Sequence, residues 1–73
     1  MTRKIDPGWT PERVKRLRQA LNLTQEEFAQ HVGVTFSTVN RWERGRKHVS
    51  KLAALRLDAL LDQARSYAKA GHS

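Results

Sequence analysis

Apolar residues recur at helical spacing in four stretches of the chain, and a capping or breaking residue bounds each stretch. The first helix is predicted to begin at Pro11 after the N-cap Thr10, and to end near Asn22, which tolerates a left-handed backbone. Its apolar stripe consists of Val14, Leu17 and Leu21. Trp9, before the cap, is placed to pack on Val14 as a hydrophobic staple.

Two short helices are predicted next. Residues 24–27, TQEE, have the pattern of a capping box, and the helix that they start ends at Gly33. Thr35 is the next candidate N-cap, and a third helix is predicted from about Phe36 to Arg44, with Gly45 as its stop. Two short helices joined by about three residues that include a glycine are typical of a helix-turn-helix.

The residue types at this junction favour a helix-turn-helix over the alternative, a purely structural helical hairpin. Ala29 is small where the helices cross, and Gly33 permits a positive φ in the turn. Apolar residues available to fill the angle are Phe28, Val32, Val34, Val39 and Trp42. We therefore predict an all-α domain of four helices over residues 10–70, with the helix-turn-helix at about 25–44.

The third helix carries an unusual outer face. At roughly 100° per residue, Val39 and Trp42 define its buried side. The opposite arc carries Phe36, Ser37, Asn40, Arg41 and Arg44. This set offers a guanidinium for guanine, an amide for adenine, a hydroxyl, and an aromatic edge for a thymine methyl, with Arg41 favoured over Asn40 as a base contact. The alternatives are that Phe36 closes the core or serves a protein interface, and that the arginines are merely solvated.

The fourth predicted helix is long, from Lys51 after the cap Ser50 to about residue 69, and it has two apolar patches. One consists of Leu57, Leu60, Leu61, Ala64, Tyr67 and Ala68, and the other of Leu52, Leu55 and Ala59. A small monomer covers only one patch, so we expect a homodimer. The interface candidates are Leu57, Leu61, Ala64, Tyr67 and Ala68, and the alternative is a monomer with a frayed C-terminus.

Charge strengthens the case for a polyanionic partner. The chain has 14 Lys and Arg against 7 Asp and Glu, a formal net charge of +7. Neutralising phosphates releases counterions, so such a balance favours nucleic acid. Arg46 and Lys47, after the third helix, are expected to contact phosphates. Residues 1–9 are predicted to be a flexible basic arm, whose Arg3 and Lys4 either reach a minor groove or stay solvated.

Several function classes are disfavoured by what the sequence lacks. It has no cysteine, no long apolar run and no secretion signal, which predicts a soluble, cytoplasmic protein. His31, His48 and His72 show no metal-ligand spacing, and no phosphate-cradling loop or activated nucleophile is recognisable. We therefore expect no enzyme activity, no metal and no cofactor.

The segment LRQALNLTQEEFAQHVGVTFSTVNRWERG resembles the Cro/repressor helix-turn-helix family, the Xre-like group of bacterial and phage regulators. The resemblance covers roughly Arg13 to Gly45. It implies a lambda-repressor-like domain that places its third helix in the major groove of double-stranded DNA. The protein would then be a transcriptional regulator, repressor-like and nucleoid-associated when bound, and a dimer would suit a palindromic operator.

The same resemblance implies residue roles. It assigns base reading to Phe36, Ser37 and Arg41. Phosphate contact falls to Gln25 and Arg44, and Gln25 is also expected to brace Phe36. Thr35 is a further candidate phosphate contact, beside Arg46 and Lys47. A structural ion pair is implied between Arg18 and Glu43, the alternative being two exposed charges.

The chain departs from the family pattern in three places. Phe36 replaces a polar residue, often glutamine, Asn22 stands where glycine is frequent, and one long helix replaces two short ones. Two rival functions remain open: an antitoxin or accessory protein that binds a partner such as a toxin through the fourth helix, and an RNA-binding protein. The sequence lacks the aromatic platform of common single-strand RNA readers.

Overall fold

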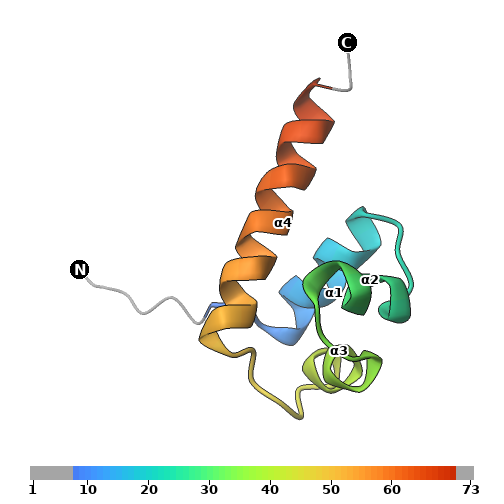
Figure 1. The fold of residues 1–73 in the computed structure, drawn as a ribbon, viewed down its shortest axis with the longest axis vertical. Helices are drawn as coiled ribbons and strands as arrows, with labels where there is room; N and C mark the ends of the chain where they lie inside the picture. The colour runs from blue at the N-terminus through green and yellow to red at the C-terminus, as the bar shows by residue number, and fades with distance from the viewer. Residues whose placement is uncertain (1–7, 71–73) are drawn as a thin grey trace, which may run out of the picture.

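The computed structural model describes the backbone of residues 8–70 and the side chains of residues 8–66. It contains α1 (Pro11–Ala20), α2 (Gln25–Val32), α3 (Phe36–Glu43) and α4 (Lys51–Ala70), with no strand in the described part. The first three helices form a compact group beside the lower half of α4, and the C-terminal half of α4 extends past them (Figure 1). The predicted all-α architecture of four helices is confirmed.

The helix boundaries follow from local capping. Thr10, Thr24 and Thr35 have extended backbones, and each hydroxyl accepts the backbone N–H three residues later. Ser50 does the same for Ala53, with an oxygen–nitrogen distance of 3.2 Å, at the start of α4. The predicted left-handed position Asn22 has φ 59°, and its N–H donates to Gln19. These signals act within a few residues, so the sequence alone locates them.

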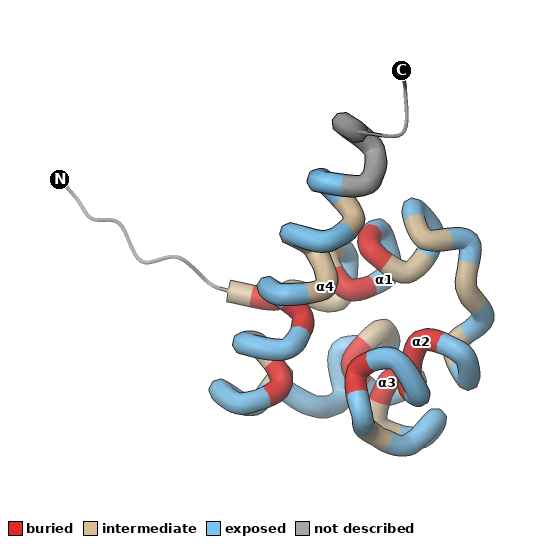
Figure 2. Tube along the Cα trace, turned by 45° about the horizontal axis from the view of Figure 1, so that its top comes forward, coloured by how far each residue is buried: buried red, intermediate tan, exposed pale blue. Residues whose placement is uncertain are grey.

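The core lies where α1, α2 and α3 meet the first half of α4. Its fully buried large side chains are Trp42, Phe28, Leu57, Val14 and Val39. Figure 2 shows buried positions on all four helices facing this interior. Ala29 is 2% exposed, which fits its expected place at a close helix crossing. In the part of the chain that the structure describes, no helix is both long and apolar enough to cross a membrane.

The prediction that Leu57 lies in a dimer interface is wrong. Leu57 is 0% exposed because it lies one turn after the buried Ala53, on the side of α4 that packs against the first three helices. Leu61 and Ala64 continue that side and are partly buried against the same core. The side chains of Tyr67 and Ala68 lie outside the described residues.

The start of the domain also differs from the expectation, because Trp9 is not part of a flexible arm. Trp9 is 9% exposed, and its indole Nε1 donates to Asp58 Oδ1 on α4 at 2.9 Å. The Arg13 guanidinium lies 4.1 Å from the centre of the Trp9 ring and donates to the Gly8 carbonyl. The folded unit therefore includes Trp9, whereas Arg3 and Lys4 lie outside the described residues.

A second polar contact ties α4 to α2. Arg56 Nη1 on α4 donates to the Val32 carbonyl at 3.1 Å. Val32 is the last residue of α2, where backbone carbonyls lack helical partners. One long side chain thus satisfies a helix terminus and holds α4 beside the turn of the helix-turn-helix.

Candidate nucleic-acid interface

The two sides of α3 differ as predicted. Val39 and Trp42 are 0% and 2% exposed and belong to the core. The opposite side carries Ser37 and Arg41, both exposed, and Phe36, which is 50% exposed. The exposed side of α3 therefore combines an aromatic side chain with a hydroxyl and a guanidinium.

Asn40 is placed differently from its neighbours on this face. It is half-buried, and its Nδ2 donates to the side-chain Oε1 of Gln25 at 3.1 Å. The Nε2 of Gln25 in turn donates to Glu43 Oε1 at 3.1 Å. Gln25 therefore braces Asn40 and Glu43, in the second half of α3. The expected contact of Gln25 with Phe36 stays a prediction.

Arg18 and Glu43 form the expected ion pair. Arg18 Nε lies 2.6 Å from Glu43 Oε2, and Arg18 Nη2 donates to Oε1 at 3.0 Å, which makes the contact bidentate. The side chains are 17% and 3% exposed. The hydrogen bond to Glu43 raises the pKa of the Arg18 guanidinium, against the opposing effect of burial. A third donor of Arg18, Nη1, binds the Leu23 carbonyl at 3.0 Å, so this residue also fixes the α1–α2 turn.

The pair leaves the outer side of α3 purely cationic. Glu43 is the only acidic residue of α3, and its charge is neutralised inside by Arg18. Gly45, just after the C-cap of α3, has a left-handed backbone with φ 73°. The Arg46 N–H donates back to the Arg41 carbonyl at 2.8 Å. Exposed basic side chains lie on both sides of this turn. The cationic edge consists of Arg41, Arg44, Arg46 and Lys47.

A family profile described as helix-turn-helix matches residues 14–66, more than half of the chain. The chain belongs to the Xre-like helix-turn-helix family. A curated relative from Rhodospirillum rubrum, named an uncharacterized transcriptional regulator in ATPase CF(0) region, is 44% identical over 39 residues. That alignment covers 53% of this chain and 36% of the relative, so the chain spans about a third of that protein. No solved structure matches the chain significantly.

Thr35, the N-cap of α3, has one more contact than the sequence predicted. The Thr35 hydroxyl accepts from Thr38 N at 3.2 Å and lies 3.0 Å from the Thr38 hydroxyl. Thr38 was missed as a member of this site, although the spacing of three residues within one helical turn could have revealed it. The Gln25–Asn40 contact had no such signal, because it joins two helices whose docking no local pattern specifies.

Proposed function

We propose that this helix-turn-helix domain is a sequence-specific, double-stranded DNA-binding regulator of transcription that inserts α3 into the major groove. The observation that carries the proposal is the two-sided character of α3. Its inner side is fixed by Val39 and Trp42, while Phe36, Ser37 and Arg41 lie exposed on its outer side. The major groove admits an α-helix and presents a distinct pattern for each base pair.

The exposed side chains suit different base edges. The Arg41 guanidinium can donate two parallel hydrogen bonds to O6 and N7 of guanine, and Ser37 can donate or accept. Phe36 can contact a thymine methyl. Asn40 is the weakest of the base candidates, since one of its amide hydrogens already binds Gln25. Its main role is then to hold Gln25 against α3.

Phosphate contacts would flank the base contacts. Arg44, Arg46 and Lys47 supply exposed positive charge at the C-terminal end of α3. At the other side, the N-terminus of α2 presents backbone N–H groups next to Gln25, whose side-chain Nε2 keeps a second hydrogen. Thr35, at the N-terminus of α3, is the remaining candidate. Such contacts fix the orientation on the duplex without reading sequence.

Selection of bound duplexes from a random pool, followed by affinity measurements across a salt series, tests the proposal. Arg41→Ala is expected to lose about 1–3 kcal/mol on the selected site and to relax preference at one base pair. Arg46→Ala is the matched control, because a phosphate contact should weaken all duplexes alike and lower the salt slope by about one. No enriched sequence would refute specific recognition. Unchanged preference in Arg41→Ala would move Arg41 to the phosphate contacts.

We further infer a dimer that binds a palindromic operator and represses by occupying it. With Leu57 buried, we place the second copy on the opposite side of α4, where Leu52 and Leu55 are 60% and 62% exposed. Two copies joined there would present two α3 helices to half-sites about one helical turn, roughly 34 Å, apart. A different protein, such as a toxin, is the alternative occupant of the same two leucines.

A further inference from the structure

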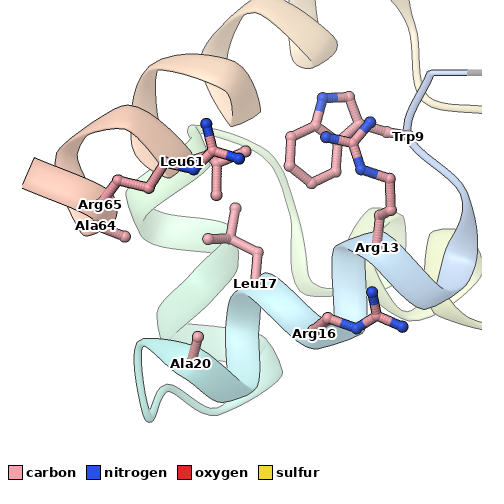
Figure 3. Close-up of a pocket in the computed structure, with 8 residues that line it drawn as sticks. All are labelled: Trp9, Arg13, Arg16, Leu17, Ala20, Leu61, Ala64 and Arg65. Carbon is pink, nitrogen blue, oxygen red and sulfur yellow. The ribbon is translucent and has the colours of Figure 1, made fainter. Parts of the chain in front are cut away.

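Phe36 supplies apolar surface on the exposed side of α3. It is 50% exposed, and it belongs neither to the core nor to the partly buried residues packed against it. It also lines neither of the two hollows beside α4, in the first of which Leu17 and Leu61 point toward each other from α1 and α4 (Figure 3). The half of its surface that stays exposed is therefore available to a partner outside the chain.

The polar groups that accompany Phe36 on α3 do not select cytosine over thymine. The Thr35 hydroxyl is engaged in the N-cap, where it accepts from Thr38 N at 3.2 Å. Ser37 is exposed, and its hydroxyl can donate to O4 of thymine or accept from N4 of cytosine. Glu43 is the acidic residue of α3, and its side chain is only 3% exposed. The exposed side of α3, all of which the structure describes, therefore offers no carboxylate to the amino group of cytosine.

The guanidinium of Arg41 belongs to a different part of this side. Arg41 lies five residues after Phe36, roughly 7.5 Å further along the helix axis at 1.5 Å per residue. Stacked base pairs are spaced about 3.4 Å apart. We therefore expect Phe36 and Arg41 to contact different base pairs, so the base beside Phe36 is recognised mainly through its apolar surface.

We propose that Phe36 recognises the C5-methyl group of a pyrimidine and accepts 5-methylcytosine in place of thymine. The inference rests on the proposed function, because it requires α3 in the major groove. Thymine presents O4 and a C5-methyl group there, and cytosine presents its N4 amino group. Methylation at C5 gives cytosine the apolar group of thymine. A phenyl ring has no hydrogen-bonding group with which to tell the two bases apart.

The consequence is a DNA-binding domain that responds to DNA modification. Methylation of one cytosine in an operator would add apolar contact area with Phe36 and strengthen binding. An operator with unmodified cytosine at the same position would be bound more weakly.

Bases that differ by one methyl group test the proposal. The base pair beside Phe36 is first identified in the selected operator as the position at which Phe36→Ala relaxes the preference. At that position, two matched pairs of duplexes are compared: thymine with uracil, both opposite adenine, and 5-methylcytosine with cytosine, both opposite guanine. Each methyl group is expected to raise the affinity about fourfold, the effect of burying one such group.

Variants assign the effect to Phe36. Phe36→Ala should bring both affinity ratios close to one, whereas Phe36→Leu, which keeps an apolar side chain, should keep part of each. Arg46→Ala is the matched control, because loss of a phosphate contact should weaken all four duplexes alike and leave both ratios unchanged. Phe36 is half exposed, so its replacement should leave the fold intact, which urea unfolding checks.

Three outcomes would overturn the inference and leave the proposed function standing. Unchanged preference in Phe36→Ala, or equal affinities within both pairs, would show that Phe36 contacts no methyl group. A preference for thymine over uracil without one for 5-methylcytosine over cytosine would show that another group rejects cytosine. Ratios that persist in Phe36→Ala would assign the methyl contact to another residue. A selection that enriches no sequence would instead refute the proposed function itself.

Discussion

The side-chain amide of Gln25 uses both of its ends on α3. Its oxygen accepts from Asn40, and its nitrogen donates to Glu43, whose carboxylate also binds Arg18 on α1. Four side chains from three helices thus form one hydrogen-bonded network next to the exposed side of α3 that is proposed to contact bases. Because the Glu43 side chain is 3% exposed, each of its partners contributes to keeping a charge inside the domain.

The substitution Gln25→Glu tests the hydrogen bond from Gln25 to Glu43. It replaces the nitrogen 3.1 Å from Glu43 Oε1 with a carboxylate oxygen while keeping size and shape. We expect urea unfolding at pH 7 to show a loss of about 1–3 kcal/mol, from the lost hydrogen bond and the like-charge contact. The repulsion raises the pKa of the carboxyl introduced at position 25 in the folded state. The loss is therefore complete above that raised pKa and shrinks as the pH falls toward the unfolded value of about 4.3.

The matched control is Gln30→Glu, which adds the same charge at an exposed position of α2. A surface change of this kind should stay within about 0.5 kcal/mol at either pH. If Gln25→Glu and Gln30→Glu cost the same, the hydrogen bond from Gln25 to Glu43 contributes nothing to stability.

At the scale of the elements, the C-terminus of α2 packs against the side chain of Arg56 on α4. Gly33 has φ 86°, a left-handed conformation that costs a residue with a Cβ roughly 1–2 kcal/mol. A Cβ added there would lie 2.6 Å from Arg56 Nη1, the atom that donates to the Val32 carbonyl. A side chain at residue 33 therefore competes with the contact that holds α4.

Gly33→Ala should accordingly destabilise more than Gly45→Ala. At Gly45, with φ 73°, the nearest atom to an added Cβ is Pro11 Cγ at an ordinary 3.7 Å, so only the backbone cost applies. We expect an extra loss of about 1 kcal/mol at residue 33, the typical worth of the hydrogen bond from Arg56. In an Arg56→Ala background the two glycine substitutions should become equal, as measured by urea unfolding. A difference that survives in that background would show that Arg56 is not its cause.

The elements also show which parts of the fold could be predicted. Helix ends depend on neighbours in the chain, so Thr10, Asn22 and Gly33 were enough to place them. The contacts that dock one helix on another, from Trp9 to Asp58 and from Gln25 to Asn40, depend on the crossing of helices, and they were not foreseen.

The wrong prediction that Leu57 lies in a dimer interface also arose because the sequence does not specify how the helices dock. Helix α4 has apolar residues on two sides, and periodicity alone does not say which side the rest of the chain covers. The candidate base contacts were easier to place, because the inner side of α3 needed only Val39 and Trp42 to be recognised as core.

At the scale of the whole molecule, the proposed dimer depends on the side of α4 that carries Leu52 and Leu55. Leu52 with Leu55 replaced by serine should convert a dimer into a monomer without loss of helix content, because both side chains are exposed in the single chain. Light scattering measures the mass, and duplexes with one or two half-sites should show that only two-site affinity falls. Replacement of both leucines by methionine, which keeps the surface apolar, should leave the dimer intact. A native chain that is already monomeric at the concentrations used for DNA binding would refute the dimer.

The hydrogen bond between Trp9 and Asp58 spans 49 positions and so closes most of the chain into a loop. Closing a long loop costs more chain entropy than forming the neighbouring contacts of α2 and α3, so we expect this closure to be a late step in folding. We therefore expect Trp42, on α3, to report the early local contacts and Trp9 to report the late closure. Stopped-flow fluorescence of variants that keep one indole each would thereby time the assembly of the helix-turn-helix separately from the arrival of the last helix.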